Sequence, residues 1–337
     1  MKKNRFPLLF TIFLLMVLHT LTSKADQSIS SAIELFEQKI CVENEEAKTL
    51  YNAILQKLKV NPDPDIISQF YATAARWKYC QGLPDSSVYF FKRSAGTAFE
   101  NNDLEQTGRM FNNVGALFQI RGKLDSSLIY YDSALHYANQ VSDMSVVGSV
   151  MIGKGIVYEM QGMLQQALLN YLEAERLFGG LNVEVLLTSR INRYAILTEH
   201  FPDQMNYNEV LVSYEMAKID TLEEHQASII QFIGNHARIN KDFEQALKFY
   251  DEGIFLSKKT GRPDLQVFLL EGKGHTYLDM EKYNEAMDAL SRARELAENN
   301  DLQNALIQTY VTLSEVCLKT NENQKAIYYA DLAIKRR

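Results

Sequence analysis

The six histidines and three cysteines are the residues of this chain best suited to metal or nucleophilic chemistry. Neither His-x-x-x-His nor Cys-x-x-Cys occurs, although these spacings commonly bring two metal ligands together. The histidines stand at His19, His136, His200, His225, His236 and His275. We therefore expect no metal, no cofactor and no catalytic residue.

Two other patterns could suggest chemistry. Gly272-Lys273-Gly274 resembles part of a phosphate-binding loop, but the rest of that motif is missing. The acidic pairs Glu45-Glu46 and Glu223-Glu224 are typical of solvated helix faces or first-turn charges. The sequence thus favours a protein that is not an enzyme.

A small residue recurs at a near-constant period and indicates the elements that carry these groups. Its positions, separated by 40, 40, 40, 43, 36, 40 and 40 residues, are Ala47, Ser87, Ser127, Ala167, Val210, Ala246, Ala286 and Ala326. A large residue mostly follows four positions later, as at Tyr131 and Tyr250, on the same helical face. Such a period predicts a stacked array of helices.

A second helical pattern precedes each of these segments and contains a recurring glycine, at Gly115, Gly155, Gly234 and Gly274. Glycine inside a helix costs roughly 1 kcal/mol relative to alanine, so its recurrence at one phase predicts close helix contact. Asp103, Asp264 and Asp301 each precede Leu and a helical stretch, and we expect them to be N-caps.

The combination of Gly115, Ser127, Tyr131 and Ala134 resembles the tetratricopeptide repeat. The period near 40 is longer than the usual ~34 residues and resembles the longer-helix class of bacterial sensor arrays. The resemblance implies an all-α, right-handed superhelical solenoid of about eight helix-turn-helix repeats. The expected units lie near residues 28–67, 68–107, 108–147, 148–190, 191–226, 227–266, 267–306 and 307–337.

By this resemblance, the first helix of each unit lines a concave groove. The positions that would point into it are Arg76, Tyr79, Arg109, Asn112, Gln119, Glu159, Gln231, Asn235, Arg238, Glu271 and His275. Amide and guanidinium groups suit the backbone and carboxylates of an extended peptide. An equally good interpretation is that these positions are simply solvated.

Two of the cysteines, Cys41 and Cys80, fall near the ends of first helices in adjacent units. An odd total does not make a disulfide framework. The sequence leaves open whether these two are bridged or are small buried residues, and we expect Cys317 to be packed in the core.

The N-terminus has the layout of a secretory signal peptide. Positive charges at its start precede an uncharged run of thirteen residues, Phe6 to Leu18, and Ser23-Lys24-Ala25 supplies small residues for cleavage. We expect residues 1–25 to be removed and residues 26–337 to be exported to the periplasm or beyond. The alternative is an uncleaved membrane anchor, although the run is shorter than the ~20 residues of a span.

The charge balance bears on the partners. The whole chain has a net charge of −7, and removing residues 1–25 leaves 31 Lys and Arg against 42 Asp and Glu, a net of −11. This balance disfavours nucleic acid and anionic membranes as partners.

The expected function is an exported, non-enzymatic scaffold that binds a protein or peptide segment in its groove. The alternative is a truncated sensory input domain of a histidine kinase or DNA-binding regulator. The last helix would leave Ile327, Leu332 and Ile334 on an open face, which suggests self-association there.

Overall fold

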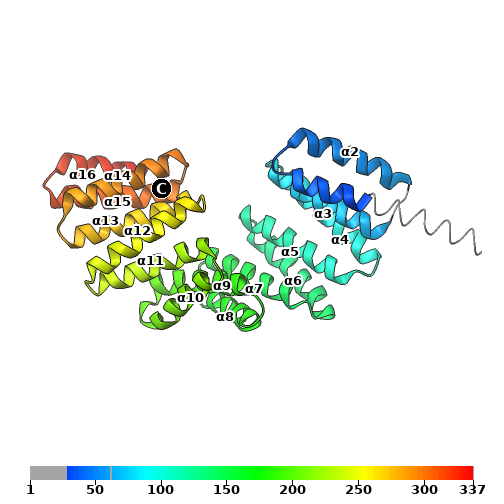
Figure 1. Cartoon of the computed structure of the whole chain (residues 1–337), viewed down its shortest axis with the longest axis horizontal. Helices are drawn as coiled ribbons and strands as arrows, with labels where there is room; N and C mark the ends of the chain where they lie inside the picture. Colours follow the sequence, from blue (N-terminus) through cyan, green and yellow to red (C-terminus); the bar gives the residue numbers. More distant parts are fainter. Residues whose placement is uncertain (1–28, 61–62, 337) are drawn as a thin grey trace, which may run out of the picture. The chain divides into compact units, whose positions relative to one another are not determined.

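The computed structural model describes residues 29–60 and 63–336, so the predicted signal peptide lies outside the described residues. The described part contains helices and no strand (Figure 1). After a first helix at 29–39, the helices are α2 (Asn44–Val60), α3 (Pro64–Cys80), α4 (Pro84–Glu100), α5 (Leu104–Ile120), α6 (Leu124–Val141), α7 (Met144–Met160), α8 (Leu164–Phe178), α9 (Val183–His200), the 3-10 helix η1 (Pro202–Gln204), α10 (Tyr207–Ile219), α11 (Glu223–Ile239), α12 (Phe243–Lys259), α13 (Pro263–Asp279), α14 (Tyr283–Asn299), α15 (Gln303–Lys319) and α16 (Asn323–Arg336).

The chain divides into two compact units, residues 1–170 and 171–337, which are described separately. In the first unit, α3 packs on α4 and α5 on α6, while α5 also contacts α7. In the second unit, α11 packs on α12 and α13 on α14, while α11 also contacts α13. First helices therefore pack on their partners in the hairpin and on the first helix of the next hairpin, and second helices pack on the first helix that follows them. The predicted all-α array of helix pairs is confirmed.

The first helices of successive pairs begin about 40 residues apart throughout the array. These helices begin at Pro64, Leu104, Met144, Val183, Glu223, Pro263 and Gln303. The uneven steps of the small residue arise in the pair α9–α10, where η1 is inserted and α10 has only 13 residues. Each unit boundary expected from the sequence, from the one after residue 67 to the one after residue 306, falls inside the first helix of a pair.

The recurring small residues lie where helices touch, as predicted. All eight, from Ala47 to Ala326, are at most 2% exposed. The recurring glycine has the same cause: a Cβ added to Gly115 would lie 2.7 Å from Cδ1 of Tyr131, and one added to Gly274 would lie 2.7 Å from Cγ of Leu290. In these units the large side chain four residues after the small one therefore occupies the space that the glycine leaves open.

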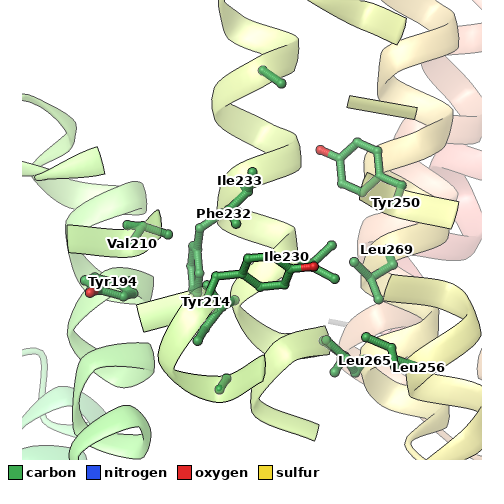
Figure 2. Packing of buried hydrophobic residues seen from close by; sticks show 14 of the residues in the cluster. Tyr194, Val210, Tyr214, Ile230, Phe232, Ile233, Tyr250, Leu256, Leu265 and Leu269 are labelled. Atoms are coloured by element: carbon green, nitrogen blue, oxygen red, sulfur yellow. The ribbon is translucent and has the colours of Figure 1, made fainter. Parts of the chain in front are cut away.

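The second unit shows how the hairpins share one core. Buried side chains from α9 to α13 form a continuous cluster (Figure 2). Tyr194 and Val210 lie at one side of this view, and Leu256, Leu265 and Leu269 lie at the other. Since each hairpin buries its apolar face against the next, stability comes from neighbouring interfaces.

Helix ends follow their own regular pattern. A residue with positive φ ends nearly every helix, at intervals of about twenty residues: Gly82, Asn102, Gly122, Ser142, Gly162, Thr221, Lys241, Gly261, Glu281, Asp301 and Asn321. This left-handed residue stops the helix and reverses the chain.

The N-cap predictions succeed in one case of three. Asp103 accepts a hydrogen bond from the backbone N of Gln106, as an N-cap does. Asp264 instead lies inside the first turn of α13, where it accepts hydrogen bonds from Arg262. Asp301 is the left-handed residue before α15, with φ 53°, so its predicted capping role is wrong.

A disulfide joins Cys41 and Cys80, with 5.3 Å between their Cα atoms. Both cysteines are exposed, so the interpretation of them as small buried residues is wrong. Cys317 is free and buried, as expected. The bridge ties the end of the helix at 29–39 to the end of α3, across the first repeat.

Candidate peptide-binding groove

A hollow of about 560 Å³ lies on the first helices of the first unit. It is formed by the helix at 29–39, α3, α5 and α7, and its size is in the range of ligand sites. Its lining residues are Ser30, Ile33, Glu34, Glu37, Gln69, Ala72, Thr73, Arg76, Gln106, Arg109, Met110, Asn112, Asn113, Ser145, Val146 and Ser149.

The base of the hollow is apolar and its rim is polar. Ile33, Ala72, Met110 and Val146 are buried side chains from four consecutive first helices. Because these side chains are packed in the core, they form a rigid apolar floor for the hollow. The polar groups around them can then determine which chemical groups are accepted.

Four side-chain amides in the hollow have no hydrogen-bond partner among residues 29–60 and 63–336. Gln106, Asn112 and Asn113 are half-buried on α5, and Gln69 is exposed on α3. Each amide offers both a donor and an acceptor. They can therefore hydrogen-bond both the N–H and the C=O of a peptide backbone.

The two arginines of the hollow are already paired within the protein. Arg76 Nη2 lies 2.8 Å from Glu37 Oε1 and also donates to the hydroxyl of Thr73. Arg109 Nη2 lies 2.6 Å from Glu105 Oε1, and its Nε lies 3.4 Å from Asp143 Oδ2.

Of the groove residues predicted for the first unit, Arg76, Arg109 and Asn112 line this hollow together. Tyr79, Gln119 and Glu159 lie toward the ends of α3, α5 and α7 and are not part of its lining. Gln119 has another partner, since the hydroxyl of Tyr131 donates to its Oε1 at 2.7 Å.

In the second unit, the predicted groove residues mostly bond to their own or neighbouring helices. Gln231 donates to the backbone O of Ser228, and Asn235 accepts a hydrogen bond from the hydroxyl of Tyr250 at 2.8 Å. Arg238 Nη1 pairs with Asp279 Oδ2 at 2.6 Å. The bonds of Asn235 and Arg238 join α11 to α12 and α13, whereas that of Gln231 stays within α11.

Glu271 and His275 join α13 to α15. Thr309 donates to Glu271 Oε1 at 2.5 Å, and the hydroxyl of Thr312 lies 3.5 Å from His275 Nε2. Glu271 is only 5% exposed, and burial raises its pKa to about 7. Burial also lowers the pKa of His275. Glu271 is therefore a buried interface residue rather than an open groove position.

Sequence reasoning missed several lining residues. Gln69 and Ser149 lie 40 residues before and after Arg109, so the repeat period itself could have identified them. Glu34 and Glu37 belong to the first repeat, whose sequence departs from the pattern and carries no such signal.

Residues 29–60 and 63–336 contain no cluster of His, Cys, Asp or Glu that could hold a metal ion. Within the same ranges, no helix is both long enough and apolar enough to cross a membrane.

No protein-family model and no curated protein matches the sequence. Solved structures do match in fold. The chain is similar to aspartyl phosphate phosphatase F from Bacillus subtilis, at 12% identity and a TM-score of 0.66, over 92% of this chain and 94% of that one. A Rap protein complexed with competence and sporulation factor matches at 11% identity and a TM-score of 0.58, over 92% and 98% of the two chains.

A third similar structure is a signal transduction ATPase with a tetratricopeptide repeat sensor, from Pyrococcus horikoshii. It matches at 13% identity and a TM-score of 0.63, over 91% of this chain and 47% of that one. The fold is that of a tetratricopeptide repeat array. At these identities, the likeness of this array to its neighbours is one of fold alone.

Proposed function

We propose that this repeat array is a non-enzymatic scaffold that binds an extended peptide or protein segment in the hollow of its first unit. The observation that carries the proposal is the set of unpaired amides beside a buried apolar base, which are those of Gln69, Gln106, Asn112 and Asn113. An extended peptide presents alternating backbone donors and acceptors that such amides can satisfy. The similar Rap protein, which has competence and sporulation factor bound, supports a binding role.

Binding to peptides of random sequence tests this function. The purified protein is titrated with fluorescent nonapeptide mixtures, and the Asn112→Ala/Asn113→Ala double variant is compared with Asn170→Ala. Asn170 is half-buried on α8, outside the hollow, and bonds only to the backbone O of Gln166 on its own helix. We expect the double variant to lose at least about tenfold in affinity and the control to lose none. Equal affinities would exclude the hollow as the binding site.

We also propose that the protein is exported. The predicted signal peptide motivates this proposal, and the exposed Cys41–Cys80 disulfide supports it, because such bridges persist mainly in oxidising compartments. N-terminal sequencing of the mature protein should read Asp26-Gln27-Ser28. Recovery of a cytoplasmic protein that begins at Met1 would rule export out.

A sensory input role is the second candidate. Its support is the Pyrococcus horikoshii protein, in which a similar repeat array is the sensor of a signal transduction ATPase. In that case, ligand binding would change the packing of successive hairpins. Co-purification with a kinase or a DNA-binding protein that depends on Asn112 would favour this candidate.

A further inference from the structure

The positive charges of the hollow are paired within the protein, whereas one of its negative charges is not. Four charged side chains line it, Glu34, Glu37, Arg76 and Arg109, and the latter two carry the positive charges. Both arginines are paired with carboxylates of the protein. Arg109 is held between Glu105 and Asp143, which lie just outside the lining.

Glu34 differs from the other three, since it has no ion-pair partner in residues 29–60 and 63–336. With Glu37, Glu105 and Asp143, the hollow and its immediate surroundings contain four carboxylates against two guanidinium groups. An incoming carboxylate would have to compete for arginines that already have partners. An incoming ammonium or guanidinium group would meet a free carboxylate at Glu34.

We propose that the hollow selects peptides with a Lys or Arg side chain that pairs with Glu34, and disfavours acidic peptides. This inference rests on the proposed peptide-binding function and names its ligand class. The net charge of the chain, −7, acts in the same direction, because it attracts basic ligands before contact.

The size of the preference follows from the exposure of the site. Glu34 is exposed, so water and salt weaken its pairing with a ligand cation. We therefore expect a single basic residue to raise affinity about fivefold over Gln at the same peptide position at low salt. The preference should shrink as ionic strength rises.

The experiment uses acetylated and amidated nonapeptide mixtures of uncharged residues, in which one position in turn carries Lys, Arg, Gln, Asp or Glu. Fluorescence anisotropy gives the affinity of each mixture for the purified protein. At one or two of the nine positions tested, a single Lys or Arg should tighten binding about fivefold relative to Gln. Asp or Glu at the same positions should weaken binding.

Variants of Glu34 make the assignment specific. Glu34→Gln should abolish the preference for basic peptides, and Glu34→Lys should reverse it. Glu100→Gln, an exposed residue at the end of α4 outside the hollow, should leave the preference unchanged.

The outcomes separate this inference from the function on which it rests. Binding that depends on Asn112 and Asn113, with no basic preference or with one that Glu34→Gln leaves intact, would overturn the inference alone. Absence of any binding that depends on the two asparagines would overturn both.

Discussion

The ring of Tyr131 lies against Gly115 so closely that a single added carbon would clash with it. A Cβ at Gly115 would stand 2.7 Å from Cδ1 of this ring, and one at Gly153 would stand 2.4 Å from its Cζ. The tyrosine of α6 therefore passes between α5 and α7 where both helices have glycine. Its hydroxyl donates a hydrogen bond to Gln119, which lies one turn after Gly115 on α5.

The first prediction concerns this contact. Gly115→Ala should lower the free energy of unfolding by about 1–3 kcal/mol, because the buried ring of Tyr131 must shift to make room for the added Cβ. Chemical denaturation measures the effect.

Gly96→Ala is the matched control. Gly96 lies within α4, and a Cβ there would have nothing within 4 Å. This substitution should stabilise the protein by up to about 1 kcal/mol through helix propensity. Equal effects of the two substitutions would contradict the proposed packing.

The second prediction concerns the left-handed helix ends. Gly122 has φ 68°, so Gly122→Ala should cost about 1 kcal/mol. Lys241 occupies the same kind of position with φ 63°, so Lys241→Gly should be neutral or stabilising by up to about 1 kcal/mol. The midpoint of thermal unfolding should fall for Gly122→Ala. For Lys241→Gly it should rise or stay unchanged. A larger loss for Lys241→Gly than for Gly122→Ala would count against this account.

The third prediction concerns pH. Glu271 has a pKa of about 7 in the folded protein and an ordinary value of 4.5. Below pH 4.5 the carboxyl is protonated in both states and has no effect on pH dependence. Between 4.5 and about 7 only the unfolded state loses its proton, so stability falls as pH rises. The full loss, on the order of 3 kcal/mol, is reached above pH 7.

Glu271→Gln isolates this effect. The amide oxygen still accepts the hydrogen bond of Thr309, but no charge forms at high pH. The variant should be more stable than the wild type at pH 8 by about 2–3 kcal/mol, and the two should converge toward pH 5. Urea unfolding at both values decides the matter, and a constant difference would refute the buried titration.

The fourth prediction concerns the disulfide. Cys41 and Cys80 are 39 residues apart, so the bridge should stabilise the first repeat by about 2–4 kcal/mol. In the Cys41→Ser/Cys80→Ser variant, amide exchange should speed up over residues 29–39 and remain unchanged over 104–120. Since Glu34 and Glu37 line the hollow from this helix, peptide affinity should fall as well. Unchanged exchange over residues 29–39 would show that packing alone holds the helix.

The array could be predicted from sequence because its determinants are local and repeated. The small residues from Ala47 to Ala326 mark the helix contacts, and the glycines mark the space for the large side chains. The helix ends were harder to predict. Asp264 and Asp301 have N-cap residue types, but Pro263 starts α13 earlier and the chain at Asp301 is left-handed.

The groove was predictable only where the repeat pattern is intact. Arg76, Arg109 and Asn112 follow from the repeat phase, whereas Glu34 and Glu37 lie in a repeat whose sequence has diverged. Glu271 has the phase of a groove residue, but α15 covers it, and phase alone does not reveal what a neighbouring helix covers. The same limit applies to Arg193, which is buried in ion pairs with Glu175 and Glu209.

The arrangement of Gly115, Tyr131 and Gly153 occurs again, 119 residues later, as Gly234, Tyr250 and Gly272. Even the flanking ion pair is repeated, as Lys154–Asp132 at 2.8 Å and Lys273–Asp251 at 2.5 Å. Two hairpins from different places in the chain therefore contact their neighbours through the same glycine–tyrosine–glycine packing and the same Lys–Asp pair. We therefore expect that exchanging one of these pairs of helices for the other would preserve the contacts with the neighbouring helices.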